Sequence, residues 1–190
     1  MSRGGESVGR YEVRRDDCTV SDDPARLDNA AIHALLATTF WGVGMDADLL
    51  RRSVEGSHSF GLYRGGRQIG FARVVTDYAR NAHLADVVIA EEERGRGLGR
   101  WLVASVLDHP ALREVRTWQL STVDTHELYR PFGFTETPPG QVMRRSLDKA
   151  AWMDAPTAAS VSPPDRTPPE DGMGGESACQ MHRFYDLEHE

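Results

Sequence analysis

Cysteine is scarce in this chain of 190 residues, which has only Cys18 and Cys179, far apart in the sequence. A secreted scaffold held by disulfides needs more cysteines, so this scarcity predicts a reducing, cytoplasmic environment. No apolar run approaches the roughly 20 residues that a membrane-spanning helix needs. Residues 1–10 contain glycine and serine but no apolar core, which argues against a secretory signal peptide. These absences predict a cytoplasmic protein with no membrane partner.

Positive charge is also limited, because the formal net charge is -7. This balance argues against nucleic acid as the main partner. Residues 94–100 nevertheless form a local basic cluster beside glycines, which suits a small anionic ligand better than a long polyanion. The histidines have no spacing typical of metal ligands, so no metal site is predicted from His109, His126, His182 or His189.

Composition divides the chain into three regions. Residues 1–9 are a polar, glycine-rich lead-in that we expect to be flexible. Residues 10–147 alternate apolar and polar runs and are predicted to form the folded domain. Residues 148–190 are rich in proline and acidic residues and are predicted to form a disordered tail. Gln180 to Leu187 regains apolar residues, so this last segment is either a docking element or part of the solvated tail.

The spacing of apolar residues predicts the helices and strands of residues 10–147. Helices are expected from Pro24 to Leu36, Asp46 to Val54, Leu98 to a stop at Pro110, and Thr125 to Pro131. Strands are expected at Tyr11–Arg15, Ser59–Arg64, Gln68–Thr76, His83–Ala90 and Arg116–Thr122, with closing strands at Phe134 and Val142–Arg144. Gly65-Gly66 is a strong hairpin signal between the second and third strands. The order predicts an α/β or α+β fold around one mixed sheet.

The basic cluster has the form of a phosphate-binding loop. An apolar strand runs through a short acidic turn into Arg94-Gly95-Arg96-Gly97-Leu98-Gly99-Arg100, where a helix begins. Glycine lets backbone N–H groups converge on one point, and the helix start adds unpaired N–H groups and a positive dipole end. This combination favours a pyrophosphate cradle; the alternative is a glycine-rich turn with solvated arginines.

Two familiar phosphate loops do not fit this segment. A P-loop needs lysine followed by serine or threonine after its last glycine, where this chain has Arg100-Trp101. A dinucleotide-binding fingerprint needs a further glycine where this chain has Leu102. The loop therefore belongs to a different class of phosphate site.

Two motifs resemble those of the GNAT superfamily of N-acetyltransferases. Its hallmark Arg/Gln-x-x-Gly-x-Gly/Ala is matched by residues 94–99, and its Tyr followed closely by Gly-Phe is matched by residues 129–134. The pairs Phe40-Trp41 and Thr122 to His126 further resemble a bacterial subgroup with no assigned substrate. The resemblance covers roughly Tyr11 to Arg145.

The resemblance implies a mixed, mostly antiparallel central sheet flanked by helices and splayed between the fourth and fifth strands. Acetyl-CoA is the implied cosubstrate, with a β-bulge near Val87–Val88 helping to open the gap and backbone groups of Val87 and Ile89 pairing with the pantetheine arm. The implied reaction moves an acetyl group to a primary amine of a small molecule or peptide by direct attack in a ternary complex. The expected coenzyme site is Val87, Val88, Ile89, Arg94, Gly95, Arg96, Gly97, Leu98, Gly99 and Arg100.

Two residues are candidates for the catalytic groups. Tyr129 resembles the family's general acid; the alternative is a tyrosine that packs on Phe132 and Phe134. His83 is the candidate base, because its offset from the loop resembles the position of the base in other family members. Strand alternation predicts that His83 shares a face with Val87 and Ile89 and that Asp86 lies on the opposite face. The alternative for His83 is a partly exposed strand histidine.

The acceptor is expected to contact Phe40 and Trp41, which lie between the first two helices where this fold usually forms the acceptor wall. Core packing of Trp41 is the alternative. Asp77 and Tyr78, at the end of a strand, are further candidates for this wall. A non-catalytic module that binds acyl-CoA is the competing function, and the sequence leaves a homodimer open.

Overall fold

A computed structural model of the chain describes residues 10–142. The chain divides after Pro138 into two compact units, and every helix and strand below lies in the first unit. The strands are β1 (Glu12–Arg15), β2 (Cys18–Ser21), β3 (His58–Arg64), β4 (Arg67–Thr76), β5 (Asn81–Ile89) and β6 (Thr117–Gln119). The helices are α1 (Asn29–Ala37), α2 (Ala47–Glu55), α3 (Leu98–Leu107) and α4 (His126–Tyr129), with 3-10 turns η1 (Pro24–Arg26), η2 (Glu91–Glu93) and η3 (Arg130–Phe132).

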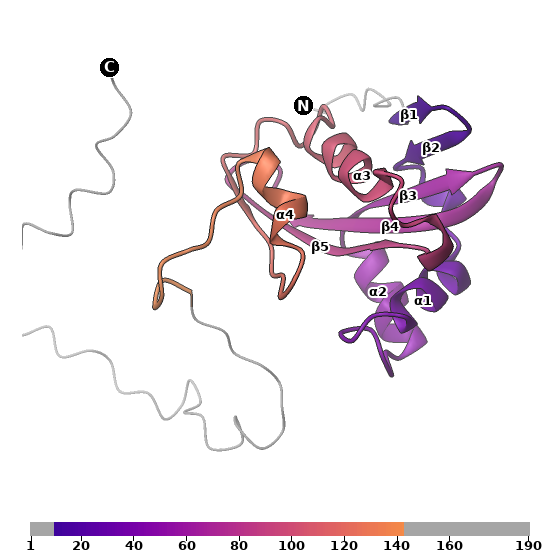
Figure 1. Cartoon of the computed structure of the whole chain (residues 1–190), viewed down its shortest axis with the longest axis horizontal. Coiled ribbons are helices and arrows are strands. Elements are labelled where there is room, and N and C mark those ends of the chain that lie inside the picture. Colours follow the sequence, from indigo (N-terminus) through magenta and orange to yellow (C-terminus); the bar gives the residue numbers. More distant parts are fainter. Residues whose placement is uncertain (1–9, 143–190) are drawn as a thin grey trace, which may run out of the picture. The chain divides into compact units, whose positions relative to one another are not determined.

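The strands form one sheet in the order β1-β2-β3-β4-β5-β6. Neighbouring strands from β1 to β5 are antiparallel, and β6 runs parallel to β5. A parallel pair needs a crossover, which α3 supplies. Figure 1 shows α3 on one side of the sheet and α1 with α2 on the other. We call these sides the α3 face and the α1/α2 face. The predicted mixed, mostly antiparallel sheet flanked by helices is confirmed.

Each face of the sheet has its own hydrophobic cluster. On the α3 face, Leu102 packs with residues such as Phe60. On the α1/α2 face, Ile32 packs with Phe71 and Val88. Because successive side chains of a strand point to opposite faces, these two clusters show which way each strand residue faces.

The first two helices begin at aspartates that cap them. Asp28 accepts hydrogen bonds from the N–H groups of Ala30 and Ala31, and Asp46 caps α2 in the same way. The predicted start of the first helix at Pro24 is therefore wrong, because η1 is a separate turn and α1 begins only after its cap. Among residues 10–142, no helix is long and apolar enough to cross a membrane.

The strands differ from the prediction at four places. β2 was not predicted; it is four residues long and follows β1 through the two-residue turn Asp16-Asp17. β6 is shorter than the predicted strand, and Phe134 lies in no strand. Val142 also lies in no strand, while the rest of that predicted strand falls outside the described residues. With β2 counted, the predicted fourth and fifth strands are β5 and β6.

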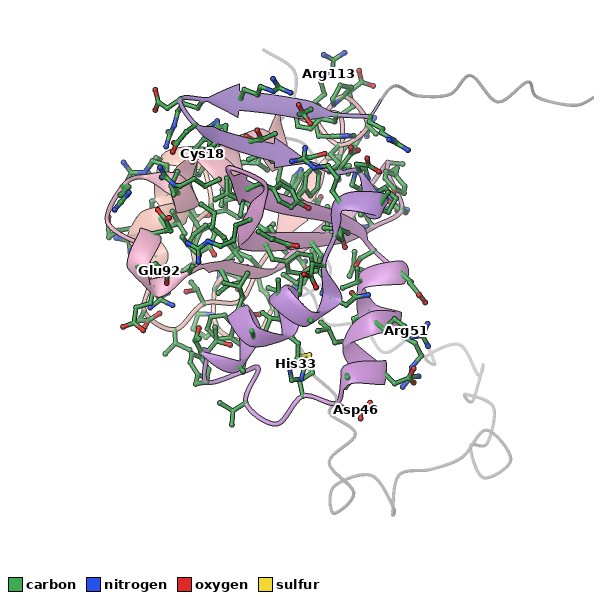
Figure 2. All side chains as sticks on the ribbon, turned by 90° about the vertical axis from the view of Figure 1, so that its right-hand side faces the viewer. Cys18, His33, Asp46, Arg51, Glu92 and Arg113 are labelled. Carbon is green, nitrogen blue, oxygen red and sulfur yellow. The ribbon has the colours of Figure 1, made fainter. Side chains whose placement is uncertain are left out.

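A histidine of α1 makes a hydrogen bond to the end of the connection between α1 and α2. Nε2 of His33 lies 2.9 Å from the carbonyl oxygen of Met45, just before Asp46 begins α2 (Figure 2). This bond closes a loop over residues 38–46, which includes the predicted acceptor residues Phe40 and Trp41.

Candidate active site

β5 and β6 separate soon after they begin to pair. Three pairs join them, and the last is His83 with Gln119. Within residues 10–142, the rest of β5, from Leu84 to Ile89, has a strand partner only on its β4 side. An unpaired strand edge offers N–H and C=O groups to an extended ligand that pairs as a strand would. The predicted splay is thus confirmed, and it leaves the backbone groups of this edge without a strand partner among the described residues.

A β-bulge lies at the start of this unpaired edge. Arg73 pairs with Ala85 and Phe71 pairs with Val88, so two β5 residues, Asp86 and Val87, lie opposite one β4 residue. Asp86 has a φ of 54°, a left-handed conformation that aspartate adopts more readily than most residues. The sequence analysis expected a bulge near Val87–Val88, and the structure has it one residue earlier.

The bulge reverses the faces that simple alternation assigns. His83 and Ala85 share the α1/α2 face with Val88, whereas Ile89 belongs to the cluster on the α3 face. The prediction that His83 shares a face with Val87 and Ile89 is therefore wrong. The prediction for Asp86 is wrong as well, because its carboxylate accepts a hydrogen bond from Arg73, which pairs with Ala85 on the α1/α2 face.

The glycine loop presents backbone N–H groups at the start of α3. Gly97 caps the helix with a φ of 73°, Gly95 has a φ of 76°, and no side chain caps the helix. The first main-chain bond of α3 runs from the N–H of Trp101 to the carbonyl of Gly97, which leaves the earlier N–H groups of the first turn available. A Cβ added at Gly95 or Gly97 would meet no atom of the described residues within 4 Å. Such a cradle fits the pyrophosphate of a coenzyme.

The arginines of the loop have different surroundings. Nε of Arg94 donates to the carbonyl oxygen of Ile89 over 3.1 Å, which ties the loop to the end of β5. Nη1 of Arg96 lies 3.4 Å from Oε2 of Glu93, a carboxylate that is only 5% exposed and also lies 3.2 Å from Arg64. Arg100 forms no ion pair in the described part of the chain. Arg94 and Arg96 therefore support the loop's own structure, and Arg100 keeps its charge unpaired.

Tyr129 lies at the end of α4 with its side chain in the cluster on the α3 face. It is 8% exposed, and its ring meets Phe134 edge to face at 6.0 Å. Burial raises the pKa of Tyr129 above its ordinary value, against the opposing effect of a hydrogen bond with Thr125. The hydroxyl therefore keeps its proton at neutral pH, as a general acid must.

Two threonines lie just before α4, the helix that ends at Tyr129. Thr122 Oγ1 lies 2.7 Å from Thr125 Oγ1 and accepts a hydrogen bond from the N–H of Thr125. These contacts close the turn that leads into α4.

The aromatic residues of the α1–α2 loop are exposed. Phe40 is 69% exposed and Trp41 is 46% exposed, and their rings meet edge to face at 4.9 Å. Core packing of Trp41 is therefore excluded. Exposed aromatic rings remain available for a ligand or partner.

Asp77 and Tyr78 lie in the turn between β4 and β5, where their main contacts are local. Oδ1 of Asp77 accepts hydrogen bonds from the N–H groups of Ala79, Arg80 and Asn81, so this carboxylate holds the turn. The Tyr78 hydroxyl lies 3.3 Å from Nδ1 of His58. These contacts join Tyr78 to a cluster on the α3 face and do not join either residue to the α1–α2 loop.

That cluster brings together three side chains that are distant in the sequence. Nε2 of His58 and Nε2 of His109 lie 3.2 and 3.1 Å from Oδ2 of Asp22, and the three potential ligand atoms lie within 4.8 Å of one another. The spacing of histidines in the sequence did not predict this assembly. Nδ1 of His109, however, accepts a hydrogen bond from the N–H of Ala111 over 3.1 Å. A metal on Nε2 would require a proton on Nδ1, so the geometry favours a hydrogen-bonded network over a metal centre.

The cluster should make stability depend on pH. Burial, and secondarily the charge of His58, lower the pKa of His109 from its ordinary value of 6.5. Stability is then complete above pH 6.5 and falls below it, because the unfolded chain binds a proton that the folded chain resists, with a slope of at most about 1.4 kcal/mol per pH unit. We expect Tm to fall from about pH 7.5 to about pH 5.5, and His109→Gln to flatten this fall. Parallel Tm curves for the wild type and the variant would contradict the assignment.

Known proteins resemble the chain in both sequence and structure. Residues 28–134 match the model of the acetyltransferase (GNAT) family. A candidate acetyltransferase of Gibberella zeae is 32% identical over 139 residues, which cover 60% of this chain and 77% of that protein. An uncharacterised N-acetyltransferase of Porphyra purpurea is 35% identical over 80 residues, 39% of this chain and 43% of that protein. The crystal structure of a candidate GNAT-family acetyltransferase from Xanthomonas campestris pv. campestris is 39% identical, with a TM-score of 0.65 over 68% of this chain and 93% of that one.

A sheet that splays beside a glycine loop at a helix start defines a protein that binds an extended, phosphorylated ligand along a strand edge. The chain belongs to the acetyltransferase (GNAT) family, and it is an acetyl-CoA-dependent N-acyltransferase. Enzymes of this family bind an amine acceptor, and the described residues contain the loop, the strand edge and the tyrosine that the sequence analysis assigned to this chemistry.

Proposed function

We propose that this protein transfers an acetyl group from acetyl-CoA to a primary amine by direct attack in a ternary complex. The observation that carries the proposal is the arrangement around the unpaired edge of β5, with Tyr129 on the α3 face and His83 on the α1/α2 face. In this proposal the amine approaches from the α1/α2 face, and the thiolate leaves toward Tyr129. Acetyl-CoA supplies the acyl thioester, and the protein supplies position and proton transfer.

The glycine loop and the edge of β5 hold the coenzyme in this proposal. Backbone N–H groups at the start of α3 bind the pyrophosphate together with Arg100, while Arg94 fixes the loop against Ile89. Backbone groups of Val87 and Ile89 pair with the pantetheine arm, because no strand occupies that side of them within residues 10–142. The acyl group then lies beside the bulge.

Proton transfer is assigned to two side chains. An amine attacks only in its neutral form, and free lysine-type amines titrate near ~10.4, so a base is required. We assign this role to His83, an exposed residue of the α1/α2 face. Asp86 lies on the same face, and its carboxylate is held by Arg73, so we assign it a positioning role instead. Tyr129 then protonates the departing thiolate.

Release of free CoA thiol from acetyl-CoA, measured across a panel of primary amines, tests the proposal. We expect amine-dependent release with at least one acceptor, and His83→Gln should remove or shift the acidic limb of the pH profile. Binding of acetyl-CoA with no acyl transfer to any amine would instead support a non-catalytic acyl-CoA-binding module. If His83→Gln keeps the pH profile of the wild type, another residue is the base, and the proposed acetyl transfer still stands.

A further inference from the structure

The guanidinium of Arg73 is fixed at one end and open at the other. Its Nε donates to Oδ2 of Asp86 over 2.5 Å, and Asp86 is its only partner among residues 10–142. The side chains of Arg73 and Asp86 are 19% and 11% exposed, and neither Nη1 nor Nη2 of Arg73 is among the buried unpaired atoms. Arg73 therefore presents its two terminal nitrogens as a fork whose direction is set by Asp86.

This fork lies on the α1/α2 face, where the cover of the helices ends. α1 and α2 cover Phe71 and Val88, but further along the same face Val75 is 48% exposed and its partner His83 is also exposed. Arg73 pairs with Ala85 between these two regions. The fork is thus positioned at the border between the helices and the open surface.

The fork is also close to the proposed acyl site. Asp86 belongs to the stretch of β5 that has no β6 partner in the described structure, and it forms the bulge with Val87. Nε of Arg73 lies 2.5 Å from Oδ2 of Asp86. A group bound at the other edge of the guanidinium therefore lies near the side chain of a residue of that stretch.

We propose that the fork of Arg73 binds a carboxylate of the acceptor, so that the acceptor is an amine with a carboxylate a few bonds away, such as an amino acid. This inference rests on the proposed acetyl transfer. Guanidinium binds carboxylate through two parallel hydrogen bonds in one plane, and only the Nη1 and Nη2 edge of Arg73 is open for them. The contact of Arg73 with Asp86, a residue of the unpaired stretch of β5 beside the proposed acyl site, favours an acceptor whose amine and carboxylate are a few bonds apart.

Asp86 acts as a positioning residue in this arrangement. A non-glycine residue with positive φ is held in a disfavoured conformation, which persists only where the surroundings enforce it. Here that conformation places the carboxylate against Nε of Arg73 and leaves the opposite edge of the guanidinium free.

Kinetics with matched acceptors test the inference. The panel pairs each amino acid with the amine that lacks only its α-carboxylate, for example phenylalanine with phenethylamine. We expect the wild type to prefer the carboxylated member. Arg73→Gln should lower kcat/KM for that member by roughly 10- to 150-fold, the loss expected for a hydrogen bond to a charged group. The kcat/KM for the decarboxylated amine and the KM for acetyl-CoA should be unchanged.

Further variants separate the fork from the charge and from folding. Arg73→Lys keeps the positive charge but loses the fork. Its kcat/KM for the carboxylated member should therefore be closer to that of Arg73→Gln than to that of the wild type. Asp86→Asn should lower kcat/KM only for the carboxylated acceptors. Arg73→Gln alone leaves the Asp86 carboxylate without its partner, which could destabilise the fold. The double variant Arg73→Gln/Asp86→Asn leaves no unpaired charge, so it should show the same loss of kcat/KM without that destabilisation. Arg52→Gln, on the exposed surface of α2, is the matched control.

Calorimetry distinguishes failure of this inference from failure of the proposed reaction. The N-acetylated member of each pair is titrated into the protein with CoA present, which requires no turnover. Tighter binding of the carboxylated member, lost in Arg73→Gln, supports the carboxylate site even if no acceptor turns over. Equal use and equal binding of both members by the wild type, or an equal loss for both in Arg73→Gln, would overturn it. A preference for aminophosphonates over amino acids would overturn the choice of carboxylate.

Discussion

Tyr129→Phe should lower kcat by roughly 10²- to 10⁴-fold, the usual contribution of general acid catalysis, with little change in the KM for acetyl-CoA. The hydroxyl meets charge that develops on sulfur only as the thioester breaks, so its loss raises the barrier without weakening coenzyme binding. Phenylalanine keeps the buried ring and its contact with Phe134. Steady-state kinetics with saturating acceptor measure the effect.

Tyr63→Phe is a matched control for this substitution. Tyr63 is also buried, burial raises its pKa to about 12, and its hydroxyl is a buried group without a hydrogen-bond partner in the described structure. Removing that hydroxyl should leave kcat unchanged. If Tyr129→Phe turns over normally while coenzyme affinity collapses, Tyr129 is a binding residue.

Much of the architecture follows from local signals in the sequence. Asp46 predicts the start of α2 because its carboxylate caps the helix, and Gly65-Gly66 predicts the β3–β4 turn because both glycines adopt positive φ. The glycine loop is local as well, since the strand, the turn and the helix start follow one another without interruption. These features depend on neighbours within a few residues, which the sequence displays directly.

The bulge was expected near Val87–Val88 from the family resemblance, but its exact place, one residue earlier, could not be predicted from local signals. A single extra residue in β5 leaves the apolar pattern of the strand nearly unchanged, yet it transfers every later side chain to the other face. For this reason alternation placed His83 on the wrong face relative to Ile89 and separated Asp86 from Arg73. The ion pair of Arg73 with Asp86 becomes visible only when the register of β4 against β5 is known.

Clusters of residues that are distant in the sequence could not be predicted either. Asp22 lies 36 residues from His58 and 87 residues from His109, and the three meet because β3 begins beside the end of α3. No spacing pattern in the sequence predicts that these three residues lie close together.

Gly97→Val should raise the KM for acetyl-CoA by roughly tenfold or more and leave kcat at saturation nearly unchanged. Valine is strained at a φ of 73°, which lowers the stability of the fold by typically about 1–3 kcal/mol. A tenfold rise in KM corresponds to a separate loss of about 1.4 kcal/mol of binding free energy. Because a Cβ there meets no described atom within 4 Å, the added side chain would extend into the space we assign to the pyrophosphate. The pyrophosphate does not react, so its binding contributes similarly to ground and transition states.

Gly66→Val separates coenzyme binding from backbone strain. Gly66 also has positive φ, 89°, with no described atom within 4 Å of an added Cβ, but it lies in the β3–β4 turn. Both variants should lower Tm, and only Gly97→Val should raise the KM for acetyl-CoA. Titration with CoA, which requires no turnover, should show the same loss of affinity. An unchanged CoA affinity in a folded Gly97→Val protein would remove the start of α3 from the coenzyme site, because a strained and obstructed loop cannot present its N–H groups as before.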